Sequence, residues 1–191
     1  MIYINDFPTV LNNSCKLFAD DAKIYRTVCS TLDQYSLQSD LDRALEWSHL
    51  WQLSFNRPKC KALHFGNGNP HFSYLLGDHN IEQVTQEKDL GEIIDEGLKF
   101  HQQTAAAVNK ANTILALIKK SFTLLDEASL PVLFKTYVRP HLEYANIIWG
   151  PHFRCDQEAI ERVQRRATKL VQCLKDLPYQ TRLQKLRLPS M

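Results

Sequence analysis

Two adjacent acidic residues, Asp20 and Asp21, have the types and spacing that suit metal chemistry, because they lie between two short apolar segments. The segments 17–19 and 22–25 have the length of short paired strands, and Asp favours turns by bonding to nearby backbone. Carboxylates held at a turn suit Mg²⁺, which takes one or two protein carboxylates together with substrate phosphates and several waters. The pattern therefore predicts a β-hairpin with an acidic tip that is suited to phosphoryl or nucleotidyl transfer.

The simpler interpretation of the acidic pair is a solvated turn. With Asp at about one residue in twenty, roughly a third of chains of this length contain such a pair by chance. The surrounding residues favour the metal-binding interpretation. Phe18 lies two residues before the pair, an apolar run precedes it, and Tyr25 ends the apolar segment that follows.

Composition places the chain among ordinary globular proteins, with 44% hydrophobic and 23% charged residues in a chain of 191. This length allows one or two domains with a hydrophobic core. The formal net charge is +2, but the segment from Arg154 onward contains nine basic and four acidic residues, a local charge of +5. We therefore predict a basic C-terminal module that either contacts nucleic acid or presents a solvated face.

The five cysteines are scattered and include no Cys-x-x-Cys pair, which argues against a disulfide framework and against a four-ligand zinc site. Cys60 and His64 have a ligand-like spacing without a second pair. The seven histidines are also scattered, and no Ser or Cys has a partner at a spacing typical of hydrolases. With neither a signal peptide nor a membrane-spanning segment, we expect an intracellular protein of the cytoplasm or nucleus that is not secreted.

Apolar periodicity predicts an α+β fold in which residues 1–98 mix helix and strand and residues 99–191 are all helical. A capping signature at Ser30 predicts a first helix over 31–51. Further strands are expected at 53–55, 61–65, 72–76, 81–84 and 90–94. Further helical segments are expected at 101–122, 126–138, 142–149 and 156–173, with Arg139-Pro140 ending or kinking the second of these.

Several segments in order resemble the reverse transcriptase of non-LTR (LINE-type) retrotransposons, over nearly the whole chain. Phe18-Ala-Asp-Asp21 is similar to the catalytic [Phe/Tyr]-x-Asp-Asp motif of that family. Other segments match the family's following helix, turn, Leu-Gly strand and thumb region. They are Trp47, Trp51-Gln-Leu53, Asn56-x-x-Lys-Cys60, Leu90-Gly91, Ile94-Asp95, Tyr137 to Trp149 and Ile160-x-x-Val-Gln-Arg-Arg-Ala167. Met1-Ile-Tyr-Ile-Asn-Asp-Phe7 resembles the segment that follows the family's Pro-Gln-Gly motif.

The resemblance implies that residues 1–98 form the C-terminal part of a polymerase palm, an antiparallel sheet with a helix, and that residues 99–191 form a helical thumb-like region. It implies Asp20 as a ligand of catalytic Mg²⁺, with Mn²⁺ as a substitute, in a two-metal mechanism, and Asp21 as a weaker metal ligand or an electrostatic partner. Lys59 would face the triphosphate, although a solvated turn lysine remains the alternative. The residues implied in primer and template binding are Phe18, Ala19, Leu90 and Gly91, and those of the basic helix are Arg162, Arg165, Arg166 and Lys169.

The resemblance further implies an RNA template, a DNA primer and deoxynucleoside triphosphates as partners of an intact parent enzyme. The family's first catalytic Asp and its fingers precede the position of Met1, so we expect a fragment that is inactive alone. Asp89 and Glu92 differ from the family, in which an aromatic and a small apolar residue are usual. Two alternatives remain open, a non-catalytic nucleic-acid-binding module and an inert remnant.

Overall fold

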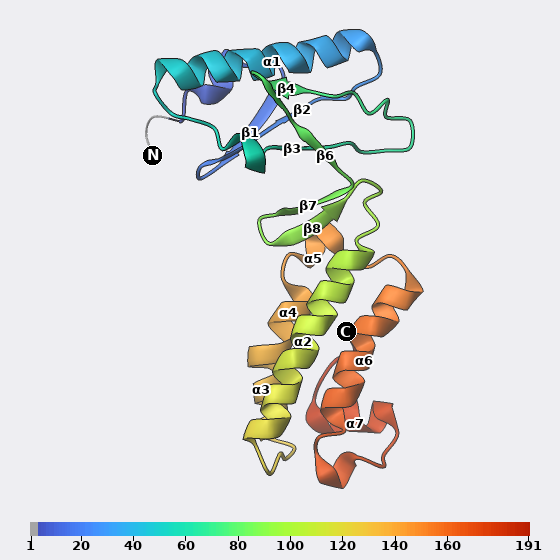
Figure 1. Ribbon diagram of the computed structural model, residues 1–191. Coiled ribbons are helices and arrows are strands. Elements are labelled where there is room, and N and C mark those ends of the chain that lie inside the picture. The colour runs from blue at the N-terminus through green and yellow to red at the C-terminus, as the bar shows by residue number, and fades with distance from the viewer. Residues whose placement is uncertain (1–3) are drawn as a thin grey trace. The chain divides into compact units, whose positions relative to one another are not determined.

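The computed structural model describes residues 4–191 and divides them into two compact units (Figure 1). The first unit extends to Glu87 and also includes Asp95–Gly97, and the second comprises Lys88–Ile94 and Leu98–Met191. Helices and small sheets both occur, which is compatible with the predicted α+β class. The first three residues of the predicted segment Met1 to Phe7 lie outside the described residues.

The first unit contains one long helix, several short strands and two 3₁₀ turns. In chain order these elements are η1 (Phe7–Val10), β1 (Ser14–Phe18), β2 (Asp21–Tyr25), α1 (Thr31–Leu50), η2 (Arg57–Lys59), β3 (Lys61–Leu63), β4 (Leu75–Leu76), β5 (His79–Asn80) and β6 (Glu82–Val84). The predicted acidic hairpin and the helix after it are both confirmed. The helix begins with a reciprocal capping box, in which Ser30 Oγ accepts from the Asp33 N–H and the Asp33 carboxylate accepts from the Ser30 N–H.

The remaining strands of the first unit differ from the prediction. Segment 53–55 forms no strand, and the hairpin expected between 72–76 and 81–84 is instead a small one in which β4 pairs with β5. Gly77, with φ at 67°, helps form a two-residue turn, so pairing resumes at His79. Strand β6 is then free to pair with β3 in parallel. Among the described residues the strands form four two-stranded sheets, not one antiparallel palm sheet.

Two small clusters of buried residues lie against α1. In one, Phe7 meets Trp47 edge to face with ring centroids 5.0 Å apart, and Ala44 completes the buried set. The other is built on Tyr74, Leu76 and Ile81. Because both clusters include side chains of α1, this helix is the common support of the acidic hairpin and of the short strands that follow it.

A hairpin of β7 (Gln86–Asp89) and β8 (Glu92–Asp95) spans the division between the two units. Its turn consists of Leu90 and Gly91, whose φ angles are 48° and 99°. Positive φ at both central residues is typical of a type I′ turn. The prediction of a strand over 90–94 is therefore wrong at its start, because these two residues reverse the chain and do not extend it.

The second unit is helical apart from its share of the β7–β8 hairpin. Its elements are α2 (His101–Ser121), α3 (Ser129–Leu133), the π-helix η3 (Phe134–Val138), α4 (Arg139–Glu143), α5 (Asn146–Trp149), α6 (Arg154–Thr168), the 3₁₀ turn η4 (Gln172–Leu174) and α7 (Tyr179–Leu186). The expected helix over 101–122 is confirmed by α2. Helix α7 was not predicted, because its eight residues are a short amphipathic segment flanked by basic residues.

The helix expected to end or kink at Arg139-Pro140 instead continues through Pro140 as α3, η3 and α4. Proline has no N–H to donate and its ring crowds the preceding turn. The π-helix widens the turns before Pro140. The Arg139 N–H donates a hydrogen bond to the carbonyl oxygen of Phe134, five residues earlier. The chain leaves the helical path at Tyr144 and Ala145, and Ala145 has φ at 52°.

Helix α6 begins at Arg154, so Asp156 lies in its first turn and is not its N-cap, which is Phe153. It ends at Thr168, five residues before the expected end. The core of the unit joins residues of α2, η3, α6 and α7 around several fully buried side chains. Those with the lowest exposure include Ala111, Leu130, Phe134, Val138, Val163 and Ala167. In residues 4–191 no helix is long and apolar enough to cross a membrane.

Candidate functional site

The acidic pair lies at the turn of the β1–β2 hairpin. Phe18 pairs with Asp21 as the last pair of the ladder, so Ala19 and Asp20 form a two-residue turn and Asp21 begins β2. All four side chains are exposed, and Phe18 retains 59% of its accessible surface. Ala19 has φ at 55°, a left-handed conformation that costs a residue with a Cβ about 1–2 kcal/mol. The positive φ lets the chain reverse within two residues, so the two carboxylates lie at the tip of the hairpin.

One face of the hairpin packs on α1. Cys15, Leu17 and Ile24 are partly buried against the cluster that contains Trp47, and Cys15 lies opposite Ile24 in the register. Burial raises the pKa of the Cys15 thiol, which favours its neutral form. Because successive side chains of a strand alternate between faces, burial of these three leaves the tip residues facing solvent.

Asp40 of α1 fixes the root of the hairpin. Its fully buried carboxylate accepts hydrogen bonds from the backbone N–H groups of Asn12 and Asn13, at 2.9 and 2.7 Å. The side-chain amide of Asn13 donates to the same carboxylate at 2.8 Å. These three bonds satisfy the backbone donors just before β1 and set the direction in which the hairpin leaves the helix.

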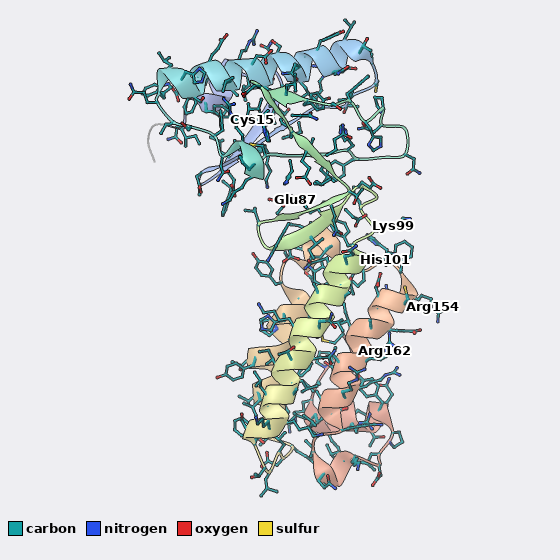
Figure 2. The ribbon with its side chains drawn as sticks, in the orientation of Figure 1. Cys15, Glu87, Lys99, His101, Arg154 and Arg162 are labelled. Carbon is teal, nitrogen blue, oxygen red and sulfur yellow. The ribbon has the colours of Figure 1, made fainter. Side chains whose placement is uncertain are left out.

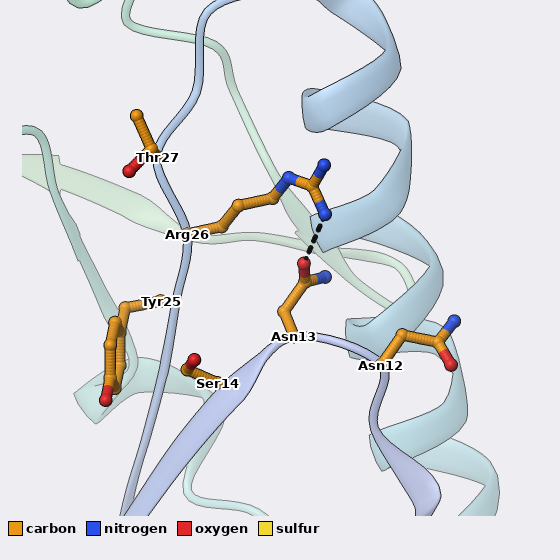
Figure 3. A pocket seen from close by; sticks show the side chains of 6 residues that line it. All are labelled: Asn12, Asn13, Ser14, Tyr25, Arg26 and Thr27. Atoms are coloured by element: carbon orange, nitrogen blue, oxygen red, sulfur yellow. Dashed lines mark hydrogen bonds between the residues drawn. The ribbon is translucent and has the colours of Figure 1, made fainter.

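Arg26 closes the other side of the hairpin root (Figure 3). It donates to Asn13 Oδ1 at 2.8 Å and, through Nε and Nη2, to Asp33 Oδ1 at 2.9 and 2.6 Å. Hydrogen bonds from Ser30 first, and then from Arg26, lower the pKa of Asp33 to about 2. A hollow beside these groups is lined by Asn12, Asn13, Ser14, Tyr25, Arg26 and Thr27.

Lys59 is exposed at the end of η2, a turn that begins after Asn56 and contains Pro58. The turn is closed by backbone hydrogen bonds from the Lys59 N–H to the Asn56 carbonyl and from the Cys60 N–H to the Arg57 carbonyl. Its neighbour Arg57 forms an ion pair with Asp78. Lys59 thus belongs to a hydrogen-bonded turn of the first unit, and its side chain extends into solvent.

Leu90 and Gly91 belong to the second unit, and both are exposed in the β7–β8 turn. A Cβ at Gly91 would lie 3.9 Å from the ring of Tyr144, which is ordinary van der Waals contact, but its φ of 99° still favours glycine. Glu92 is buried and accepts a hydrogen bond from Gln103 of α2, while Gln103 Oε1 accepts from the Ile93 N–H at 2.9 Å. Burial raises the pKa of Glu92. Glu92 and Gln103 thus tie β8 to α2.

The four predicted basic residues of the α6 region are all exposed, opposite the buried residues Ile160, Val163 and Ala167. Their intramolecular contacts differ. Arg165 lies over the ring of Tyr179 at 4.9 Å from the centroid, and Arg166 donates to Asn112 Oδ1 at 3.0 Å. Arg162 donates from Nε to the Glu158 carbonyl at 3.2 Å, and Lys169 is the C-cap residue.

The second unit contains a group of potential metal ligands that no sequence pattern indicated. Its members are His101, Cys155 and Asp156, whose ligand atoms all lie within 4.8 Å of one another. The histidines are scattered along the sequence, and His101 lies 55 positions from Asp156. Only the packing of α2 on α6 brings these residues together, so local spacing contained no signal for them.

The chain is similar to an RNA-directed DNA polymerase from the mobile element jockey of Drosophila funebris, with 27% identity over 138 residues. The match covers 70% of this chain and 15% of the relative. No family model matches the sequence. No solved structure matches it with significance. The match supports the resemblance to reverse transcriptases of non-LTR elements that Phe18-Ala-Asp-Asp21 and the other segments indicated.

Proposed function

We propose that this chain forms the C-terminal palm and the thumb-like part of a retrotransposon reverse transcriptase, which copies RNA into DNA by two-metal nucleotidyl transfer. The observation on which the proposal chiefly depends is the β1–β2 hairpin, where Asp20 occupies the turn and Asp21 opens the second strand. The similarity to the jockey RNA-directed DNA polymerase supports the same assignment. The first unit then corresponds to the palm and the second to the thumb.

The exposed carboxylates of Asp20 and Asp21 would hold Mg²⁺, or Mn²⁺ in its place, at the hairpin tip. Both carboxylates are exposed, which leaves their oxygen atoms accessible to a hard cation. Bound there, the ions supply Lewis-acid chemistry, lowering the pKa of a primer hydroxyl and neutralising the departing pyrophosphate. Phe18 and Ala19 would support the primer end, and the ammonium of Lys59 would approach the triphosphate.

In residues 4–191 the compact groups of three or more His, Cys, Asp and Glu ligands do not include Asp20 or Asp21. Two ions normally need carboxylates from more than one position. The chain also spans 15% of the length of the relative. We therefore expect the purified chain to bind Mg²⁺ weakly and to leave a primer on an RNA template unextended.

A chimera tests the catalytic assignment. The matching 138-residue segment of the jockey polymerase is replaced by the corresponding residues of this chain, and primer extension on RNA is measured with Mg²⁺. We expect extension that is lost, by at least about a thousandfold, in the Asp20→Ala chimera, because the ion has lost its ligand. The matched control is Asp42→Ala, an exposed acid on α1 away from the tip. Equal extension by the Asp20→Ala and control chimeras would reject the assignment.

The isolated chain gives a second test that does not need the chimera to fold. Mn²⁺ broadens the NMR signals of nuclei near it, so titration should broaden the amides of Asp20 and Asp21 first. Asp20→Asn with Asp21→Asn should abolish this broadening. If Mn²⁺ broadens Asp20 and Asp21 no more than the exposed acids Glu46 and Asp78, the tip is not a metal site.

The second candidate function is non-catalytic binding of a nucleic-acid duplex. It is favoured by the exposed basic residues of α6, which lie opposite a buried apolar stripe in a segment of net charge +5. Phosphate contacts of this kind provide affinity without sequence specificity. Binding to an RNA–DNA hybrid that responds to the α6 substitutions but not to Asp20→Ala would identify this function apart from catalysis.

A further inference from the structure

The His–Cys–Asp cluster, defined as His101, Cys155 and Asp156, lies in the second unit and is distinct from the acidic hairpin. The His101 Nδ1 lies 2.6 Å from Asp156 Oδ2. The ligand atoms of all three residues lie within 4.8 Å of one another. This spacing is close to what three ligands of one small cation require, since Zn–S is about 2.3 Å and Zn–N and Zn–O are about 2.0–2.2 Å.

Two helices hold the cluster. His101 is the first residue of α2, and Cys155 and Asp156 lie in the first turn of α6. A second bond, from Arg166 to Asn112, joins the same helices about three turns further along each of them. The contact of His101 with Asp156 joins the starts of the two helices, and the bond of Asn112 with Arg166 joins residues further along both. The two helices therefore run parallel, with their starts together. Figure 2 shows His101 and Arg154 at the same end of this pair.

The exposure of the three residues permits entry of an ion. Cys155 is exposed, the His101 side chain retains 46% of its accessible surface, and Asp156 retains 13%. Phe153, directly before α6, contacts the imidazole with ring centroids 4.6 Å apart. The ring of Phe153 thus restricts the imidazole from one side while the Asp156 carboxylate fixes its Nδ1 side.

We propose that His101, Cys155 and Asp156 bind Zn²⁺, with a water molecule as the fourth ligand. Sulfur, imidazole nitrogen and carboxylate oxygen are the three ligand types that Zn²⁺ takes in proteins, and a site with three protein ligands keeps one open position. The thiolate discriminates against Mg²⁺ and Ca²⁺, which prefer oxygen ligands. On binding, the Cys155 Sγ–H loses its proton to solvent and the imidazole binds in its neutral form.

The charges of the complex are balanced. A thiolate and a carboxylate together neutralise the two charges of the ion, so that the complete site has no net charge at the starts of α2 and α6. This balance is needed because a helix N-terminus has a partial positive charge that opposes a bare cation and favours the negative ligands. The His101–Asp156 pair opens slightly on binding, because two ligands of a tetrahedral Zn²⁺ lie about 3.3 Å apart.

Zn²⁺ at this place would cross-link the starts of two helices that lie 55 positions apart along the chain. It would bind the folded second unit and not the unfolded chain, and so raise the midpoint of thermal unfolding. The competing interpretation is an ordinary ion pair between an imidazolium and a carboxylate that joins the two helices. An ion pair needs no thiol, so Cys155 separates the two interpretations.

The test uses the full 191-residue chain, stripped with a chelator and titrated with Zn²⁺ alone. We expect one equivalent to bind and to raise the unfolding midpoint, and Co²⁺ in its place to give the charge-transfer absorption of a thiolate ligand. Cys155→Ser should lower the Zn²⁺ affinity at least about tenfold and remove that absorption. The matched control is Cys173→Ser, an exposed cysteine in the same unit that should leave both unchanged.

Two further variants complete the test. His101→Gln and Asp156→Asn should each also lower the Zn²⁺ affinity by about tenfold or more. If Asp156→Asn unfolds the chain, Cys155→Ser still decides, since an exposed thiol is not required for folding. Zn²⁺ binding that is equally strong in Cys155→Ser and wild type, or absent in wild type, would overturn the proposal and leave the ion pair as the role of His101 and Asp156.

Discussion

Asp40 Oδ2 accepts hydrogen bonds from both the backbone N–H and the side-chain amide of Asn13, at 2.7 and 2.8 Å. With the bond from the Asn12 N–H to Oδ1, one buried carboxylate on α1 satisfies three donors at the hairpin root. The position of the acidic tip depends on this contact, because the strand that leads to Asp20 begins directly after Asn13.

Replacing this carboxylate should destabilise the first unit. Asp40→Ala removes the acceptor of three part-buried hydrogen bonds, and leaving a buried donor without an acceptor costs about 1–3 kcal/mol. We expect the free energy of unfolding to fall by about 2–4 kcal/mol, measured by urea denaturation monitored with circular dichroism. Glu46→Ala, an exposed acid on the same helix, should change it by less than about 0.5 kcal/mol. Equal effects of the two substitutions would contradict the anchoring role of Asp40.

Asp33 should make stability depend on pH in acid. Its pKa is about 2 in the folded chain, because Ser30 and Arg26 bond to its ionised form, and is near 3.8 without them. The unfolded chain therefore takes up this proton first as the pH falls. The stabilisation from Asp33 is fully present above about pH 4 and is lost between about pH 4 and pH 2.

NMR titration of the Asp33 carboxyl carbon measures this shift directly. Asp33→Asn should unfold with a smaller loss of stability between pH 4 and pH 2 than wild type, because the substituted amide does not titrate. Arg26→Gln should raise the pKa of Asp33 towards its ordinary value. An unshifted midpoint in wild type would mean that the Ser30 and Arg26 bonds do not form in solution.

The acidic hairpin and the major helices could be predicted because their signals are local. Ser30 and Asp33 lie three positions apart and form the capping box, and Ala111, Leu115 and Ile118 of α2 follow the helical period. The Leu90-Gly91 turn was missed because its apolar neighbours resemble a strand, whereas two positive φ angles make it a reversal. Continuation through Pro140 depends on a π-helix, whose i to i−5 bonds leave no periodic pattern in sequence.

The sequence predicted only those parts of the candidate site whose residues are contiguous in the chain. Asp20 and Asp21 are adjacent, and their turn follows from the residues on either side. Asp40 bonds to Asn13 from 27 positions away, and the resemblance contained no indication of that contact. Pairing of β3 with β6 in parallel likewise depends on the turn at Gly77, which frees Glu82–Val84 from the expected hairpin.

Tyr179 should give the second unit a dependence on alkaline pH. Its hydroxyl donates to Glu161, and burial first, then this bond, raises its pKa to about 12 from an ordinary 10. The folded chain therefore keeps the phenol proton after the unfolded chain has lost it. Stability due to this group is fully present below about pH 10 and declines from pH 10 to pH 12.

Absorbance of the tyrosinate ion measures this titration. The difference between wild type and Tyr179→Phe should titrate near pH 12, and Tyr179→Phe should lose less stability between pH 10 and pH 12. Tyr137→Phe, which removes an exposed phenol of the same unit, is the control. A Tyr179 midpoint near 10 would show that the phenol is not held by Glu161 in solution.

The basic residues of the α6 region should contact phosphates if the second unit is a thumb. Arg162 and Lys169 test this most directly, because Arg165 also lies over Tyr179 and Arg166 also bonds to Asn112. Arg162→Ala with Lys169→Ala should weaken binding to an RNA–DNA hybrid and to duplex DNA with little dependence on base sequence, since phosphate contacts fix position without reading bases. Each lost contact should reduce the slope of log affinity against log salt by about 0.9 on duplex DNA.

The matched control is Lys119→Ala with Lys120→Ala, an equal change of charge at two exposed residues at the far end of α2. Titration at several salt concentrations decides between the two interpretations, and identical slopes for all three proteins would mean that the basic face of α6 is only solvated surface.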